Sequence, residues 1–283
     1  MKHILKEGKL SILLPEREGG ALSGEVYLIK HNGKKYVVRR CSNLPKAKYY
    51  ESISKKLEKY DFLPKLLGRF GKDVLYEFIE GRDLRRNEKS FVFEQLGEIG
   101  AFVNKQKIES NPNFKFNKTL RELISGKYVQ SPKVLMRRKR SNIRKKPKAV
   151  LSSKEANKIK KLYSYLMRKT KAKIRMDISD FVPGNFRLRK GKVYLVDVES
   201  IKSVIKGRGI AKCFRGFCNT EKRKELFIKG YTNISSMDFL DETYLDLCHL
   251  LFAVQALHFK VQVNRDSKED LEKIETLLKK YKI

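Results

Sequence analysis

Tight β-hairpins near the start of the chain limit its fold more than any other feature of the sequence. The β-branched and aromatic runs 26–29 and 36–38 flank Asn32-Gly33, and Asn-Gly is the strongest short signal for a two-residue hairpin turn. A second pair of runs, 65–70 and 74–79, flanks Gly71-Lys72-Asp73. The sequence therefore predicts a small antiparallel, β-rich region at the start of the chain.

Helical periodicity follows the hairpins. Residues 46–60 place Tyr49, Ile53 and Leu57 on one face, which predicts a helix. From about Asn87 the chain becomes mainly helical, and helices are expected at 153–170, 239–259 and 268–281, the first with Ser152 or Ser153 as its N-cap. We therefore expect an α+β fold with two lobes, a β-rich N-lobe at 1–81 and a helical C-lobe at 82–283 that meet near Gly81.

The charge of the chain indicates the chemistry of its partners. The 283 residues carry 65 Lys and Arg against 32 Asp and Glu, a formal net charge of +33. Such a surface argues against a polycationic ligand and favours nucleotides, phosphorylated molecules, nucleic acid or an acidic membrane face. No run approaches the ~18 apolar residues of a membrane span, so we expect a cytoplasmic protein with no transmembrane segment.

Much of this charge lies in a basic insert at 126–175, where 19 basic residues oppose one acid, Glu155. A like-charged block repels itself, so its densest part, Arg137–Lys148, is expected to be a mobile loop. Contact with RNA or an acidic membrane surface is one interpretation of this insert. A merely solvated face is the other.

The residues that carry chemistry follow the insert. Asp180 precedes Asn185 by five positions, a hairpin follows across Lys190-Gly191, and Asp197 stands near the end of its second, apolar strand. Phosphoryl transfer needs one carboxylate to accept or orient a hydroxyl, and it needs an amide oxygen and a second carboxylate to hold Mg²⁺ against ATP phosphates. Asp177 lies eight positions before Asn185 and does not fit this spacing.

These motifs resemble the aminoglycoside phosphotransferase and choline kinase family, which has a protein-kinase-like fold. The family's catalytic loop reads H-G-D-x-x-P-G-N, and this chain has Ile178-Ser-Asp-Phe-Val-Pro-Gly-Asn185, with Ile178 in place of the His. The family's Asp-x-Glu matches Asp197-Val-Glu199. The resemblance implies an ATP-dependent kinase with Asp180 as catalytic base and with Asn185 and Asp197 as ligands of Mg²⁺.

The resemblance also implies a nucleotide site in the N-lobe. A Gly-rich hairpin would cover the phosphates, Arg39 would take the place of the phosphate-pairing Lys, and Glu51 would pair with that base. Because side chains alternate along a strand, Arg39 and Arg40 cannot both face the cleft, and we favour Arg39. The expected cofactor-binding residues are Gly20, Gly24, Val26, Val37, Arg39, Glu51, Glu77 and Ile79, the last two through backbone groups that meet adenine.

The expected reaction is transfer of the ATP γ-phosphoryl group to a hydroxyl of a small acceptor that is anionic or of lipid or sugar type. Aminoglycosides fit poorly because relatives hold those polycations in acidic pockets. A RIO-like protein kinase is one alternative, although no activation loop or A-P-E-like segment follows Asp197. A catalytically idle, nucleic-acid-binding pseudokinase is the other.

Overall fold

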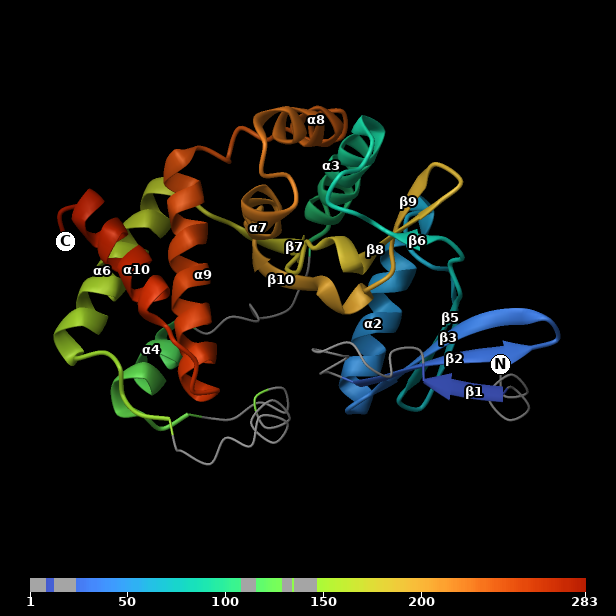
Figure 1. The fold of residues 1–283 in the computed structure, drawn as a ribbon, viewed down its shortest axis with the longest axis horizontal. Helices are drawn as coiled ribbons and strands as arrows, with labels where there is room; N and C mark the ends of the chain where they lie inside the picture. The colour runs from blue at the N-terminus through green and yellow to red at the C-terminus, as the bar shows by residue number, and fades with distance from the viewer. Residues whose placement is uncertain (1–8, 13–23, 108–115, 129–133, 135–146) are drawn as a thin grey trace. The chain divides into compact units, whose positions relative to one another are not determined.

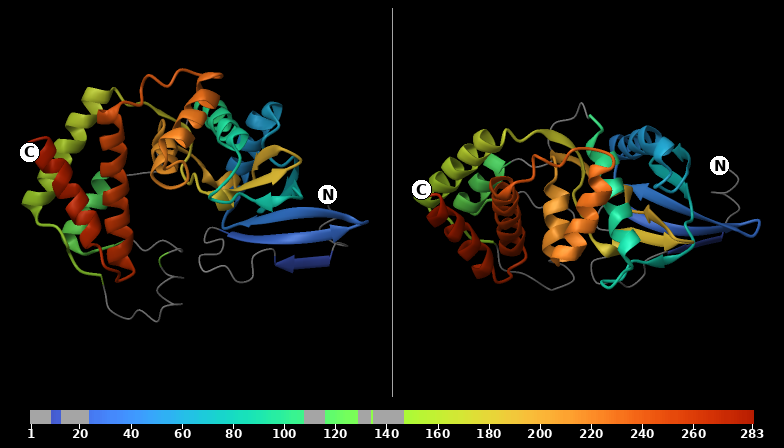
Figure 2. Two further views of the ribbon diagram at one scale, coloured as in Figure 1. Left: turned by 45° about the horizontal axis from the view of Figure 1, so that its top comes forward. Right: turned by 90° about the horizontal axis from the view of Figure 1, so that it is seen from above.

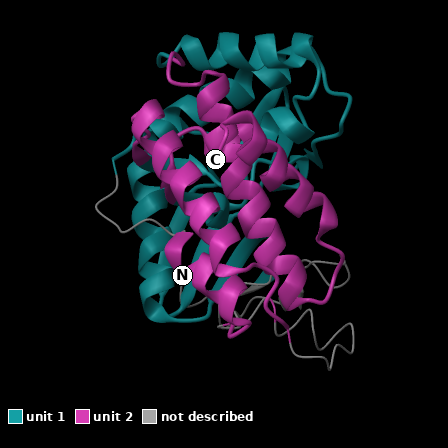
Figure 3. Ribbon diagram, turned by 90° about the vertical axis from the view of Figure 1, so that its left-hand side faces the viewer, with its two compact units in different colours: residues 1–108, 175–202, 212–236 teal, residues 109–174, 203–211, 237–283 magenta. Residues whose placement is uncertain are grey.

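The computed structural model describes residues 9–12, 24–107, 116–128, 134 and 147–283 (Figure 1). The chain divides into two compact units (Figure 3). Unit 1 comprises residues 1–108, 175–202 and 212–236, and unit 2 comprises residues 109–174, 203–211 and 237–283. The expected lobe boundary at Gly81 falls within unit 1 and stays a prediction.

Unit 1 contains the expected antiparallel sheet, with the strand order β1-β2-β3-β5-β4. Both hairpins are confirmed, because β2 pairs with β3 and β4 pairs with β5. Positive φ angles at Asn32 (49°), Gly33 (70°) and Gly71 (57°) explain why these residue types occupy the turns. The strands are β1 (Lys9–Ile12), β2 (Gly24–His31), β3 (Lys34–Cys41), β4 (Leu66–Phe70) and β5 (Asp73–Glu77).

Helix α2 (Leu44–Leu57) packs against this sheet, as Figure 1 shows. It begins after Asn43, whose side chain accepts a hydrogen bond from the backbone N–H of Lys46 at 2.9 Å. Its buried face includes Tyr50, Ile53 and Leu57. The predicted helix at 46–60 is therefore confirmed, except that its last three residues form a 3₁₀ turn.

The rest of unit 1 contains a second, three-stranded antiparallel sheet in the order β6-β8-β9. Two helices of this unit approach so closely that only glycine fits at the crossing. A Cβ atom on Gly97 would lie 2.0 Å from the carbonyl oxygen of Phe227, and one on Gly230 would lie 1.9 Å from that of Glu94. The elements are β6 (Arg82–Asp83), α3 (Ser90–Asn104), β8 (Phe186–Arg189), β9 (Lys192–Leu195) and α8 (Glu221–Thr232).

Three elements continue from one unit into the other along the chain. They are β7 (Ile174–Ile178), β10 (Ile201–Ile205) and α7 (Arg208–Gly216). The strands β7 and β10 pair with each other in a two-stranded sheet. This pairing was not predicted, and the loop that follows β7 carries Asp180.

Unit 2 is helical, and its core lies between α9 and the helices that pack against it, α4, α6 and α10. Figure 2 shows α9 and α10 side by side. The expected N-cap is Ser152, which forms a reciprocal capping box with Glu155. The predicted helices are confirmed with small shifts at their ends. The helices are α4 (Phe116–Ser125), α6 (Ser153–Thr170), α9 (Glu242–Gln262) and α10 (Lys268–Lys280).

Within the basic insert the structure describes residues 126–128, 134 and 147–175. The expectation of a mobile loop at Arg137–Lys148 falls mostly outside the described residues. Among the helices that the structure does describe, none is both long enough and apolar enough to cross a membrane.

Candidate active site

A short loop after β7 presents Asp180 with its backbone fixed. The Ser179 backbone N–H and hydroxyl both donate to the carbonyl of Ser200, at 2.7 and 2.8 Å. The Asp180 carbonyl accepts from the Val182 backbone N–H at 3.0 Å and from Nδ2 of Asn185 at 2.7 Å. The Asp180 side chain is nevertheless 49% exposed, so a solute can reach its carboxylate.

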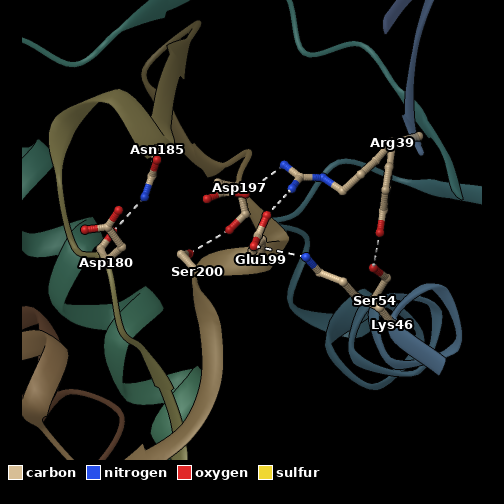
Figure 4. Close-up of polar contacts among 9 residues, drawn as sticks. Arg39, Lys46, Ser54, Asp180, Asn185, Asp197, Glu199 and Ser200 are labelled. Carbon is tan, nitrogen blue, oxygen red and sulfur yellow. Dashed lines mark hydrogen bonds and ion pairs between the residues drawn. The ribbon is translucent and has the colours of Figure 1, made fainter. Parts of the chain in front are cut away.

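The β8–β9 hairpin brings Asn185 next to the segment that carries Asp197. Phe186 lies opposite Leu195, so the residue before β8 and the residues after β9 meet at the same end of the hairpin. The backbone N–H of Val196 donates to the carbonyl of Asn185 at 2.9 Å. Because Nδ2 of Asn185 donates towards Asp180, its amide oxygen points the other way (Figure 4).

Arg39 reaches these acidic residues from β3, as Figure 4 shows. Its Nη2 donates to Oδ1 of Asp197 and its Nη1 to Oε2 of Glu199, both at 2.8 Å. Arg40 points to the other side and forms a bidentate pair with Asp73 at 2.9 and 3.0 Å. Strand alternation therefore places only Arg39 among the residues that follow β9.

Glu51 does not form the ion pair that the sequence led us to expect. It contacts Nζ of Lys55 at 2.8 Å and Nε of Arg69 at 2.5 Å, and these two cations hold the pKa of its carboxyl below the usual value. The charged residue of α2 that reaches the Arg39 cluster is Lys46, whose Nζ lies 3.3 Å from Oε1 of Glu199. The expected Arg39–Glu51 pair is thus corrected to an Arg39–Glu199 pair.

The angular positions of residues on α2 explain this correction. Lys46 and Tyr50 are four residues apart and share one face of the helix. Both lie near Arg39, because the Arg39 guanidinium and the Lys46 ammonium are each 5.7 Å from the centre of the Tyr50 ring. Glu51 is rotated by one residue, about 100°, from that face and meets β4 instead.

Burial controls the protonation of this cluster. It raises the pKa of the Asp197 carboxyl, and the neighbouring carboxylates of Glu199 and Asp180 raise it further, while Arg39 opposes the shift. For Arg39, burial lowers the pKa, but Asp197 and Glu199 outweigh it and leave the pKa raised. The site therefore holds three carboxylates, those of Asp180, Asp197 and Glu199, against the buried cation Arg39 and the more exposed cations Lys46 and Lys212.

The residues present fit a magnesium ion shared with phosphates. Asn185 offers an amide oxygen and Asp197 a carboxylate, which are hard oxygen ligands, and Mg²⁺ commonly binds through one or two carboxylates together with substrate phosphates. Among the described residues no group of three or more His, Cys, Asp or Glu side chains could hold a metal ion by itself. Such a site would need the phosphates to complete it.

Four of the predicted nucleotide residues share one face of the sheet. Gly24 lies opposite Cys41, and Val26 lies opposite Arg39. Val37 is two residues before Arg39, so its side chain lies on the same face. The remaining glycine of the predicted phosphate loop, Gly20, lies outside the described residues.

At the predicted adenine-binding segment, several polar groups already have partners. The backbone N–H of Glu77 donates to the carbonyl of Lys65, and its Oε1 accepts from the Lys65 backbone N–H, both at 3.0 Å. The carbonyl of Ile79 accepts from Nη1 of Arg187 at 2.9 Å. The role of Glu77 and Ile79 in nucleotide binding stays a prediction.

Sequence reasoning missed two cations of this site, Lys46 and Lys212. Nζ of Lys212, in α7, contacts Oδ1 of Asp180. Each residue is one of 65 Lys and Arg, and Lys212 meets Asp180 across 32 positions of the chain. No local motif marks either one.

The Arg39 contacts predict how stability responds to mutation. Glu199→Gln should lower the free energy of unfolding by about 1–3 kcal/mol, because two cations lose a charged partner beside a mostly buried guanidinium. In the matched variant Glu51→Gln the two cationic partners are 23% and 64% exposed, against 12% and 25% for those of Glu199, so the free energy of unfolding should change by less than about 1 kcal/mol. Urea unfolding measures both. The opposite ranking would mean that α2 carries the main partner of Arg39.

Comparisons with solved structures give the fold a context. Choline kinase LicA from Streptococcus pneumoniae matches with a TM-score of 0.67 at 15% identity, over 99% of this chain and 96% of that one. A Plasmodium vivax ethanolamine kinase matches with 0.58 at 12% identity, over 97% and 82%. Spectinomycin phosphotransferase APH(9)-Ia, solved with ADP and spectinomycin, matches with 0.56 at 15% identity, over 96% and 88%.

These matches confirm the predicted fold class and the predicted resemblance. The chain has the α+β, protein-kinase-like fold of the aminoglycoside phosphotransferases and choline kinases. No protein-family model and no curated protein sequence matches it. At these identities the likeness is one of fold.

Proposed function

We propose that the protein is an ATP-dependent phosphotransferase that transfers the γ-phosphoryl group to a hydroxyl of a small acceptor. One observation carries this proposal. A loop and a hairpin bring Asp180, Asn185 and Asp197 to one place, and Arg39 reaches Asp197 from the sheet. Solved structures of the same fold include kinases for choline, ethanolamine and spectinomycin, one of them with bound ADP.

Each residue has a role that its surroundings permit. Asp180 is exposed and held through its backbone, so it is suited to orient an acceptor hydroxyl and to accept its proton. Asn185 and Asp197 would hold Mg²⁺, which when bound offsets the charge of the ATP phosphates. The planar fork of Arg39 suits two phosphate oxygens.

We propose that the nucleotide lies along the sheet face formed by Gly24, Val26 and Val37. Gly20 would help to cover the phosphates, and the backbone of Glu77 and Ile79 would contact the adenine. Glu51 would act indirectly, by holding α2 in place through its contact with Arg69 of β4. The packing of α2 against β3, from which Arg39 reaches the carboxylates, supports this arrangement. When ATP binds, Arg39 would give up its hydrogen bond to one of its two carboxylate partners and donate to phosphate oxygens instead.

The acceptor that we propose is anionic, of lipid-headgroup or sugar type. Choline and ethanolamine are cationic alcohols, whereas this chain has a formal net charge of +33, which repels them and attracts anions. A RIO-like protein kinase and a nucleic-acid-binding pseudokinase are the alternatives to this proposal.

Labelled ATP separates these functions. The protein is incubated with γ-labelled ATP, Mg²⁺ and separate pools of small metabolites, lipids, protein and RNA. Our proposal expects label in small metabolites or lipids, a protein kinase would label protein, and a pseudokinase would label nothing. Label confined to protein, or no transfer in any pool, would contradict the proposal.

Helix α6 offers a surface for the anionic partner that the basic insert predicts. Positions spaced by three, four and seven residues share a helix face, and on α6 one such face is exposed and basic. Glu155, the only acid of the helix, is used in the capping box. This face comprises Lys154, Lys158, Lys161, Tyr165, Arg168 and Lys169. We propose that it contacts an acidic membrane surface, with Tyr165 at the interface.

The surface is tested by changing Lys154, Lys158, Lys161 and Lys169 together to Gln. Each Lys near an acidic bilayer contributes about 1 kcal/mol, so partitioning onto vesicles that contain phosphatidylserine should fall at least about tenfold and lose most of its salt dependence. Vesicle sedimentation measures this, with neutral vesicles as the control. Unchanged partitioning would contradict the proposal, as would binding of RNA but not of vesicles.

A further inference from the structure

Lys212 contacts the carboxylate of Asp180, which we propose accepts the proton of the acceptor hydroxyl. Its Nζ meets Oδ1 of Asp180, and the two side chains are 38% and 49% exposed. Both therefore reach the solvent from which an acceptor arrives. The neighbours of Lys212 in α7, Ala211 and Cys213, are buried, so the helix is anchored and the direction of Lys212 is set.

The fold does not need this contact to hold the loop. The Asp180 carbonyl is bonded to Val182 and Asn185, and Ser179 is bonded to the carbonyl of Ser200. An ion pair between exposed side chains adds little stability. Stability therefore does not account for the position of Lys212 beside Asp180.

The geometry of the proposed reaction indicates which group of the acceptor Lys212 can bind. An acceptor hydroxyl served by Asp180 lies within about 2.6–3.2 Å of its carboxylate. The ammonium of Lys212 contacts the same carboxylate, so the acceptor atoms next to that hydroxyl lie within a few ångströms of a positive charge. At such distances a cationic substituent is repelled and an anionic one is attracted.

We propose that Lys212 is a specificity-determining residue that binds an anionic group of the acceptor, a phosphate or a carboxylate close to the reacting hydroxyl. This inference rests on the proposed phosphotransferase function and adds the residue that selects the substrate class.

The test uses γ-labelled ATP, Mg²⁺ and a cell extract separated by charge into anionic, neutral and cationic water-soluble fractions and anionic and zwitterionic lipids. The variants are Lys212→Gln, Lys212→Arg and Lys212→Glu, with Arg215→Gln as the matched control. Arg215 lies on the same helix and is exposed. Thermal melting checks the fold of each variant, and a thermal shift with Mg²⁺-ATP checks nucleotide binding.

Wild-type protein is expected to label an anionic fraction, and the water-soluble and lipid arms tell which source supplies it. For that acceptor Lys212→Gln should raise KM at least about tenfold with a smaller change in kcat, and should flatten the dependence of KM on salt. Lys212→Arg should recover most of the loss, Lys212→Glu should bind the anion worst, and Arg215→Gln should match wild type. The Mg²⁺-ATP shift should be the same in all.

Three results would overturn the inference while leaving the phosphotransferase function intact. They are labelling of a neutral or cationic fraction by wild type, an unchanged KM in Lys212→Gln, and an equal loss of kcat for every acceptor, which would mean that Lys212 only positions Asp180. A lowered Mg²⁺-ATP shift in Lys212→Gln would move its role to the γ-phosphate and would also overturn it. No label in any fraction would instead reject the proposed function itself.

Discussion

Asp180→Asn should reduce phosphoryl transfer by ~10² or more, the usual scale for a positioned general base, while leaving the fold and ATP binding nearly unchanged. The amide has the shape of the carboxylate, and its oxygen can still accept from Lys212. The backbone bonds that hold the loop do not involve the Asp180 side chain. The loss should therefore appear in kcat and not in the thermal shift caused by Mg²⁺-ATP.

Asp177→Asn is the control for this prediction. Asp177 is fully buried, and its Oδ1 accepts from the backbone N–H of Ile178 at 2.7 Å, so an acceptor cannot reach it. Turnover per folded molecule should fall much less than in Asp180→Asn, and melting curves correct for any loss of stability. Retained turnover above about a tenth of wild type in Asp180→Asn, or the reverse ranking of the two variants, would remove Asp180 from the role of base.

Asp197→Ala should abolish the part of ATP binding that depends on magnesium. Neither Asn185 nor Asp197 is a metal cage alone, so Mg²⁺ should bind weakly without ATP and strongly with it. In wild type, ATP at about 100 times its Kd should stabilise the protein by about 2.7 kcal/mol, mainly when Mg²⁺ is present. At roughly 2–4 °C per kcal/mol, this is a shift of several degrees.

The melting temperature of Asp197→Ala without ligand will also fall, because Arg39 loses one of its two carboxylate partners. The prediction therefore concerns the difference between ATP with and without Mg²⁺ in each variant. Asp73→Ala is the matched control, because it breaks the exposed pair with Arg40 in the same sheet. It should keep the full magnesium-dependent shift. A full shift in Asp197→Ala would contradict the assignment of Asp197 as a metal ligand.

Local features of the sequence predicted local features of the fold. Asn32-Gly33 and Lys190-Gly191 adopt the positive φ angles that their hairpins require, and both hairpins are present. The register of the β8–β9 hairpin brings Asn185 and Asp197 together. Their proximity therefore followed from the Lys190-Gly191 turn, which is evident in the sequence. Strand alternation likewise separated Arg39 from Arg40.

Features that depend on tertiary packing could not be predicted in this way. Glu51 and Lys46 lie on different faces of α2. Only the packing of that helix on the sheet determines which of the two contacts the Arg39 cluster. Lys212 meets Asp180 through α7, whose sequence has no motif that points to the loop. The pairing of β7 with β10 joins segments that are distant in the sequence.

Phosphorus NMR of a reaction that contains the protein, Mg²⁺-ATP and the fraction that accepts label tests the central claim most directly. The account predicts that a phosphomonoester signal grows in step with ADP, that little inorganic phosphate appears, and that Asp180→Asn slows this growth by ~10² or more. Release of inorganic phosphate without a new phosphomonoester, or ATP that stays intact in the wild-type reaction, would contradict it.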